Sequence, residues 1–217
     1  MRTQTSMHAM NYRSPAIMIF LGISLQQAQA GMIDKDGMAP WEICGMCHGL
    51  DGNSHMPKFP KLAGQKADYI KAQFLAFNSG ERSNDGGQMQ AITEEVQPGD
   101  IDRIAQYFSG LVAPKPTADV SDQALFQQGE AIYTQGRKGL PACQDCHNAN
   151  RADTPWLDAQ HEDYLIKQLE DFRSGNRTND PESVMSEIAK TLQADEQTAV
   201  VHYLSRSSLR PQNPEQK

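Results

Sequence analysis

Two short motifs of the form C-x-x-C-H carry the clearest chemistry in this chain: CGMCH at 44–48 and CQDCH at 143–147. Two thiols at this spacing, followed at once by an imidazole, suit covalent attachment of haem. The thiols add to the two vinyl groups, and the histidine then reaches the iron from one side. The sequence therefore predicts two covalently bound haem c groups. The attachment residues are Cys44, Cys47, Cys143 and Cys146, and the first axial iron ligands are His48 and His147.

The same four cysteines could instead form disulfides, and two C-x-x-C pairs could hold zinc. A zinc site gives no reason for a histidine at the same adjacent position in both copies, whereas haem attachment requires one. The motifs thus favour haem, and redox-active or structural disulfides are the alternative.

The N-terminal residues predict an export signal. Arg2 and Arg13 precede the apolar run AIMIFLGISL, and AQA at 28–30 has the small-x-small pattern of a cleavage site. The run is too short to cross a bilayer as a helix, which takes about 20 residues. We therefore expect a secretory signal peptide at 1–30 and a periplasmic protein. An uncleaved membrane anchor is the alternative.

The composition, 38% hydrophobic and 22% charged, is ordinary for a globular chain, and the net charge is −7. Removal of residues 1–30 takes away Arg2 and Arg13 but no acidic residue, so the mature chain would be more acidic still. Such a surface repels nucleic acid and anionic lipid headgroups and attracts a basic protein. We expect no nucleic-acid partner, at most peripheral membrane association, and a monomer.

An internal repeat follows each motif. GQKADYIKAQFLAFNSGERSND from Gly64 aligns with AQHEDYLIKQLEDFRSGNRTND from Ala159, with Tyr69 over Tyr164, an offset of 95 positions. The motifs themselves are offset by 99, so the second copy has lost four residues where GLDGNSHMPKF gives way to NANRADT. The chain is a tandem duplication, and we expect its second copy to bind haem beside a shorter, tighter loop.

Both copies show helical periodicity and no convincing strand. The stretches 99–111 and 195–207 predict a last helix in each copy, and 121–136 predicts another, with Ser121 as its N-cap. In the second repeat one helical face is predicted to carry Tyr164, Leu165, Gln168, Leu169 and Phe172, with Gly175 as the C-cap. The predicted fold class is all-α with two tandem domains, 31–112 and 121–210, joined by a proline-containing linker at 113–120.

The second axial ligand decides whether a haem transfers electrons or binds a substrate. Met185 is the only methionine after His147, and the repeat places Met89 over it. These two are the predicted sixth ligands, and packing of both in the hydrophobic core is the alternative. Histidine is the competing ligand type, but no further histidine recurs in both copies. The unmatched ones are His55, His161 and His202.

Two further matched pairs could serve the cofactor. Arg82 and Arg177 could contact haem propionates, because a guanidinium group binds a carboxylate through two hydrogen bonds. Exposed arginines that aid solubility are the alternative. Pro60 and Pro155 could each offer a carbonyl to Nδ1 of the preceding histidine, or could simply stiffen a loop.

In its motifs the chain resembles the dihaem cytochrome c4 family of bacterial periplasms, over residues 41–204. The stretches that carry the resemblance are CGMCHGLDGNS, FPKLAGQKADYIKAQFLAFNSGER, MQAI, IAQYF and GEAIYTQG…LPACQDCH. The resemblance implies two class I cytochrome c folds about a pseudo-twofold axis, with His48 and Met89 on one iron and His147 and Met185 on the other. In the second half, CHNANRADTP and LDAQ depart from the family's glycine-bearing CHG continuation and from LAGQ.

The function that the resemblance implies is that of an electron carrier in a respiratory chain, which donates to a terminal oxidase or exchanges electrons with a cytochrome bc complex or another redox protein. Haem attachment uses all four cysteines, so none is left to ligate a catalytic haem of the thiosulfate-oxidising kind, and His/Met ligation leaves no open site for a substrate. The chain is therefore not expected to be an enzyme. The alternative is the dihaem cytochrome subunit of a flavocytochrome c sulfide dehydrogenase, with a flavoprotein partner.

Overall fold

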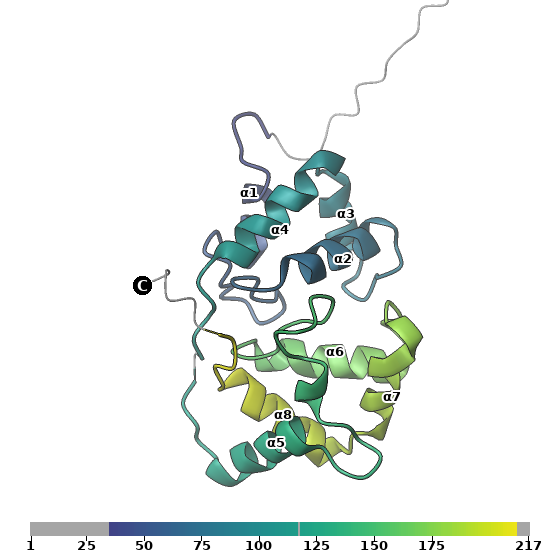
Figure 1. Ribbon diagram of the computed structural model, residues 1–217. Coiled ribbons are helices and arrows are strands. Elements are labelled where there is room, and N and C mark those ends of the chain that lie inside the picture. Colours follow the sequence, from purple (N-terminus) through teal and green to yellow (C-terminus); the bar gives the residue numbers. More distant parts are fainter. Residues whose placement is uncertain (1–34, 117, 212–217) are drawn as a thin grey trace, which may run out of the picture. The chain divides into compact units, whose positions relative to one another are not determined.

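The structure, a computed structural model, describes residues 35–116 and 118–211, and these residues contain helices and no β-strand (Figure 1). The first half contains α1 (Glu42–His48), α2 (Ala67–Asn78), α3 (Gln88–Glu94), the 3-10 turn η1 (Pro98–Asp100) and α4 (Ile101–Gly110). The second half contains α5 (Gln123–Gln135), η2 (Cys143–Asp145), α6 (Glu162–Ser174), η3 (Pro181–Ser183), α7 (Val184–Thr191) and α8 (Ala194–Ser205). The all-α prediction is confirmed.

Each half has its own hydrophobic core, built from the helical faces that the periodicity predicts. In the first half, α4 buries Ile104 and Phe108 against Ile70 of α2. In the second half, Leu165 of α6 lies in one cluster with Val201 of α8. Gly175 ends α6 in the left-handed conformation, at a φ of 80°, as expected of a C-cap glycine.

The helix α5 crosses α8 closely at a single glycine (Figure 1). A Cβ atom on Gly129 would lie 2.0 Å from the carbonyl oxygen of Ala199, so only glycine permits this approach. Tyr203 of α8 packs edge-on against Phe126 of α5, with ring centroids 5.0 Å apart. The prediction of Ser121 as the N-cap of α5 is wrong: Asp122 is the cap, because its carboxylate accepts from the backbone N–H of Leu125 at 3.0 Å.

The helices of both halves fall inside the predicted domains 31–112 and 121–210, whose boundaries and linker remain predictions. The predicted signal peptide at 1–30 lies outside the described residues. Among the residues that the structure does describe, no helix is long and apolar enough to cross a membrane.

Candidate haem sites

The first C-x-x-C-H motif forms helix α1 itself. Cys44 is buried and Cys47 is exposed, and His48 is the last helical residue. The imidazole of His48 is buried, and its Nδ1–H donates to the carbonyl oxygen of Pro60 at 2.8 Å. Burial lowers the pKa of His48, so the ring is neutral and Nε2 is left as the donor for a metal.

The second motif repeats this arrangement on the short turn η2. The Nδ1–H of His147 donates to the carbonyl oxygen of Pro155 at 2.9 Å. Burial, with a smaller contribution from the nearby cations Lys66 and Arg151, lowers the pKa of His147 to about 4. The prediction that Pro60 and Pro155 orient the two histidines through their carbonyls is therefore confirmed in both halves.

None of the four motif cysteines forms a disulfide in the structure, so the disulfide alternative has no support. Burial raises the pKa of both Cys44 and Cys143 to about 11, which keeps these thiols protonated. A pair of thiols beside a buried neutral imidazole is the donor set that covalent attachment of haem requires, and both halves present it.

The loop after the second motif is held by side chains where the first loop relies on glycine. In the first loop Gly52 has a φ of 69°, and a Cβ atom there would lie 2.7 Å from the backbone nitrogen of Ala63. In the second, the amide of Asn148 donates to two carbonyls of η2, and the hydroxyl of Thr154 donates to the carbonyl of Cys146 at 2.7 Å. The shorter loop thus reaches the same histidine geometry by other bonds.

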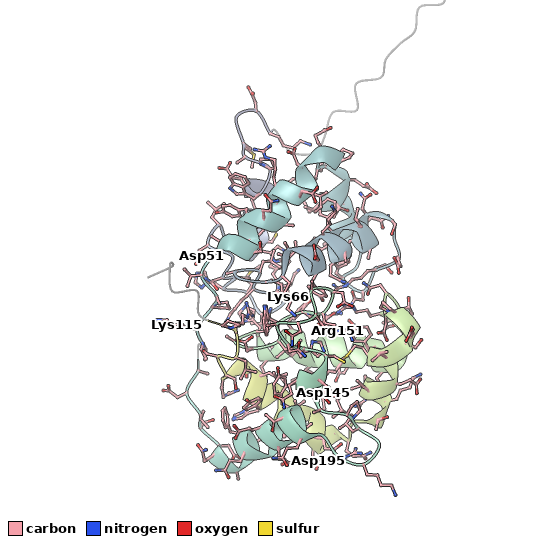
Figure 2. The ribbon with its side chains drawn as sticks, in the orientation of Figure 1. Asp51, Lys66, Lys115, Asp145, Arg151 and Asp195 are labelled. Atoms are coloured by element: carbon pink, nitrogen blue, oxygen red, sulfur yellow. The ribbon has the colours of Figure 1, made fainter. Side chains whose placement is uncertain are left out.

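Each of these loops is also held by a residue from the opposite half. Nζ of Lys66 donates to the carbonyls of Asn148 and Arg151 at 2.6 and 2.5 Å and lies 4.4 Å from the ring centroid of Trp156. Figure 2 labels Lys66 and Arg151. The residue that matches Lys66 in the second repeat is His161, whose Nε2 lies 2.9 Å from the carbonyl oxygen of Ser54. The first loop is therefore held by a histidine and the second by a lysine.

The two predicted methionine ligands occupy matched positions at the start of α3 and α7. The backbone N–H of Met89 donates to the carboxylate of Asp85 at 2.6 Å, and that of Met185 donates to Asp180 at 3.0 Å. Both side chains are half-buried, and neither belongs to the hydrophobic cluster of its half. Asp85 and Asp180 were not predicted as site residues. The Asn-Asp pair that recurs at 84–85 and 179–180 is the sequence pattern that could have identified them.

The competing histidines have other surroundings. His55 is exposed, and His161 is engaged with the carbonyl of Ser54. His202 is buried in α8, and its Nε2 has no hydrogen-bond partner among the described residues. These three side chains share no common position in the two halves, unlike Met89 and Met185.

Arg82 and Arg177 are buried, so their reading as exposed solubilising residues is wrong. Each guanidinium group donates to a glutamine of both halves: Arg82 to Gln73 at 2.7 Å and Gln168 at 2.9 Å, and Arg177 to Gln168 at 2.8 Å and Gln73 at 2.9 Å. Arg82 also donates to Tyr164, which belongs to the second half. The two cations therefore lie close together across the interface between the halves.

Neither arginine forms an ion pair with a carboxylate of the described residues. Phe77 and Phe172 each stack under one guanidinium group at 4.4 Å. Burying a charge without a counter-charge is costly, so this pair of cations fits a cofactor that carries carboxylates. Haem has two propionates, and the residues present therefore fit it.

A second set of reciprocal bonds shows the twofold relation between the halves. The side chain of Gln65 bonds both the N–H and the carbonyl of Trp156, each at 2.9 Å. Gln160, which matches Gln65, bonds the N–H and the carbonyl of Lys61 at 2.9 and 3.0 Å. Because Lys61 and Trp156 are themselves matched positions of the repeat, each half makes the same pair of hydrogen bonds to the other.

A scan against models of protein families found no match. Cytochrome c4 of Pseudomonas aeruginosa is 36% identical over 203 residues, which cover 90% of this chain and 98% of that protein. The thiosulfate dehydrogenase electron acceptor of Stutzerimonas stutzeri is 33% identical over 169 residues, 75% of this chain and 77% of that protein. The solved structure of Acidithiobacillus ferrooxidans cytochrome c4 matches with a TM-score of 0.68 at 31% identity, covering 76% of this chain and 99% of that one.

These similarities extend over both halves and both motifs. They establish the predicted pair of class I cytochrome c domains, the two covalently bound haem c groups at the C-x-x-C-H motifs, and the role of a carrier without enzymatic activity of its own. On its duplicated haem-binding sequence, its helical fold and its relatives, the chain belongs to the cytochrome c4 family of dihaem electron-transfer proteins.

Proposed function

We propose that His48 with Met89 and His147 with Met185 are the axial ligands of the two haem irons. The observation that carries this proposal is the matched placement of each methionine at the start of a short helix, outside the hydrophobic core and pinned by an equivalent aspartate. When bound in this way, haem supplies a one-electron couple and offers no open coordination site. The protein contributes neutral imidazoles, held in orientation by Pro60 and Pro155.

Replacement of the methionines one at a time tests the ligand assignment. Met89→Ala and Met185→Ala are each expected to remove about half of the sulfur-to-iron charge-transfer absorption of the oxidised protein. The matched control is Met56→Ala, because Met56 is exposed and has no counterpart in the second half. Full absorption in Met185→Ala would show that the second iron has a different ligand.

Arg82 and Arg177 are proposed to neutralise the haem propionates. Their burial, their proximity across the interface and their lack of a carboxylate partner among the described residues support this role. Arg82→Gln is expected to lower the reduction potential of the haem beside it, since loss of a cation destabilises the reduced, more negative form. An unchanged potential in both Arg82→Gln and Arg177→Gln would contradict it.

At the level of the cell, the proposed role is that of a periplasmic carrier that donates electrons to a terminal oxidase. The predicted signal peptide supports the compartment, and the acidic composition supports a partner with a basic face. Stopped-flow oxidation by a purified oxidase should slow as salt is raised, because the Debye length shrinks to about 10 Å at 0.1 M. Oxidation that accelerates with salt would contradict the expected charge complementarity.

A second candidate role is that of the electron acceptor of a thiosulfate dehydrogenase, because a relative with that name is 33% identical to this chain. The two roles are separated by reduction kinetics. The chain should be reduced by such a dehydrogenase with thiosulfate as the electron source, and not by thiosulfate alone. The alternative of a flavocytochrome c subunit stays a prediction, which co-purification with a flavoprotein would support.

A further inference from the structure

Arg210, near the C-terminus, is the residue that breaks the twofold symmetry of the interface. One nitrogen of its guanidinium group, Nη1, donates to the carbonyl oxygen of Ala63 at 2.7 Å, and Nη2 donates to the carbonyl oxygen of Asp158 at 2.9 Å. Ala63 and Asp158 are matched positions of the repeat, at the same offset of 95 as Tyr69 and Tyr164. A single planar group thus bonds equivalent carbonyls of both halves, which places it on the pseudo-twofold axis.

No such residue occurs at the equivalent place in the first half. The alignment that pairs Tyr107 with Tyr203 puts Pro114 opposite Arg210, and proline has no side-chain donor. Asp158 likewise stands where the first half has Ala63. Arg210 and Asp158, which have no equivalents in the first half, therefore meet at the axis. Their ion pair makes the otherwise symmetric contact between the halves asymmetric.

Arg210 and Asp158 form a buried ion pair in which nearly all of the hydrogen-bonding groups have a partner. The side chains of Arg210 and Asp158 are 3% and 2% exposed, and Nε of Arg210 donates to Oδ1 of Asp158 at 2.9 Å. The other carboxylate oxygen accepts from the backbone N–H groups of Leu209 and Arg210. A buried pair of this quality tolerates loss of neither partner, because the remaining charge is left without a counter-charge.

A second buried cation, Lys61, lies close to Arg210. Nζ of Lys61 donates to the carbonyl of Ala159 at 2.7 Å, and burial together with the charge of Arg210 lowers the pKa of Lys61. Lys61 also exchanges two backbone bonds with Gln160 of the opposite half. These contacts of Lys61 between the halves therefore involve the neighbours of the Arg210–Asp158 pair.

We infer that Arg210 is a positioning residue: through Asp158 and the carbonyl of Ala63 it sets the placement of one haem domain on the other, and so the rate at which electrons pass between the two haems. The rate of electron transfer falls steeply with the separation of the two groups, so a looser interface slows it. The inference rests on the relay role proposed above.

The test uses the haem-loaded protein with Arg210→Met, Asp158→Ala and the double variant. In the control, Arg206→Met, an arginine of the same segment loses an ion pair with Glu162 that lies entirely within the second half. Two quantities are measured: internal electron exchange in the half-reduced protein, and hydrogen exchange at the backbone amides of Lys61 and Trp156, which donate across the interface.

Arg210→Met should slow internal electron exchange several-fold and speed hydrogen exchange at these two amides at least tenfold. Amides in the interior of α8 and both reduction potentials should stay as in the wild type. The double variant removes both charges of the pair, so it should regain hydrogen-exchange protection relative to Arg210→Met. Arg206→Met should change neither quantity.

Other outcomes would overturn the inference. Unchanged electron exchange in Arg210→Met, or an equal loss of protection throughout α8, would show that Arg210 contributes stability alone. If Arg210→Met does not assemble, Arg210→Lys replaces it, since lysine keeps the charge but has one nitrogen in place of the three that bond Asp158 and the two carbonyls. Unchanged electron exchange in Arg210→Lys would equally contradict the inference. A wild-type protein without internal exchange would instead refute the relay role itself.

Discussion

At the scale of single residues, the two haem sites differ most in the charge beside their attachment loops. The loop after His147 has Lys66 bonded to two of its carbonyls, and Nη1 of Arg151 lies 3.7 Å from Sγ of Cys146. The corresponding contact on the first loop comes from His161, which bonds Ser54. A positive charge favours the reduced state of a nearby iron, so we expect Lys66 to stabilise reduced haem in the second half more than in the first.

We therefore predict that Lys66→Gln lowers the reduction potential of the second haem and leaves the first nearly unchanged. The shift should be on the order of tens of millivolts, where about 59 mV corresponds to a tenfold change for one electron. A redox titration measures it, with each haem assigned through the Met89→Ala and Met185→Ala variants. Lys71→Gln is the matched control, because Lys71 of α2 pairs with exposed Asp102 of α4 within the first half. Equal shifts of both haems would contradict a local effect.

At the scale of the elements, the crossing of α5 over α8 depends on the absence of one side chain. The backbone of α8 at Ala199 lies against Gly129, and no rotamer change can relieve a clash with a backbone carbonyl. The aromatic contacts of Tyr203 with Phe126 and Tyr133 hold the two helices in this register. The pair also encloses part of the core around Ile132 and Val201, behind the second motif.

Gly129→Ala should destabilise the second half by about 3 kcal/mol or more, since overpacking typically costs about 1–3 kcal/mol and here the obstacle is backbone. The free energy of unfolding, from denaturant titration followed by helical circular dichroism, measures the loss. Gly110→Ala is the control, because an added Cβ there meets nothing within 4 Å and alanine favours a helix by up to about 1 kcal/mol. Equal stability of Gly129→Ala and the wild type would show that α5 can move away from α8.

At the scale of the whole molecule, the two haem domains are joined by polar bonds, many of which are reciprocal. Gln65 and Gln160 each bond the backbone of the opposite half, and the buried pair of Arg82 and Arg177 shares the same two glutamines. Such bonds contribute little net free energy each, about 0.5–1.5 kcal/mol, but they require one relative placement of the halves. The chief effect of the interface is therefore to fix the placement of one domain relative to the other.

The double variant Gln65→Ala, Gln160→Ala should accordingly uncouple the halves. Four hydrogen bonds across the interface are lost, so about 2–6 kcal/mol of coupling disappears, and calorimetry should show one thermal transition in the wild type and two in the variant. The exposed Gln144→Ala, whose amide bonds only Thr134 of its own half, is the control and should keep a single transition. A wild type that already unfolds in two steps would contradict the coupling.

The sequence by itself determined the features that depend on local spacing. The C-x-x-C-H motifs, the faces of α4 and α6, the C-cap at Gly175 and the pairing of Met89 with Met185 all follow from residues close together in the chain or from the repeat. The prediction that Pro60 and Pro155 offer carbonyls to His48 and His147 was also confirmed, because each proline lies only a short loop after its histidine.

Only the tertiary structure decided which residues meet across the two halves. Lys66 reaches the second loop, Arg82 bonds Gln168, and Arg210 bonds Ala63, although these partners stand 82, 86 and 147 positions apart. No helical or strand periodicity links such positions, because both halves must fold and pack before the side chains come together. The departure of LDAQ from LAGQ was visible in the sequence, but the role of Asp158 was not. Its partner is Arg210, an arginine beyond the last helix. The charge of Arg210 needs a carboxylate only because folding buries it.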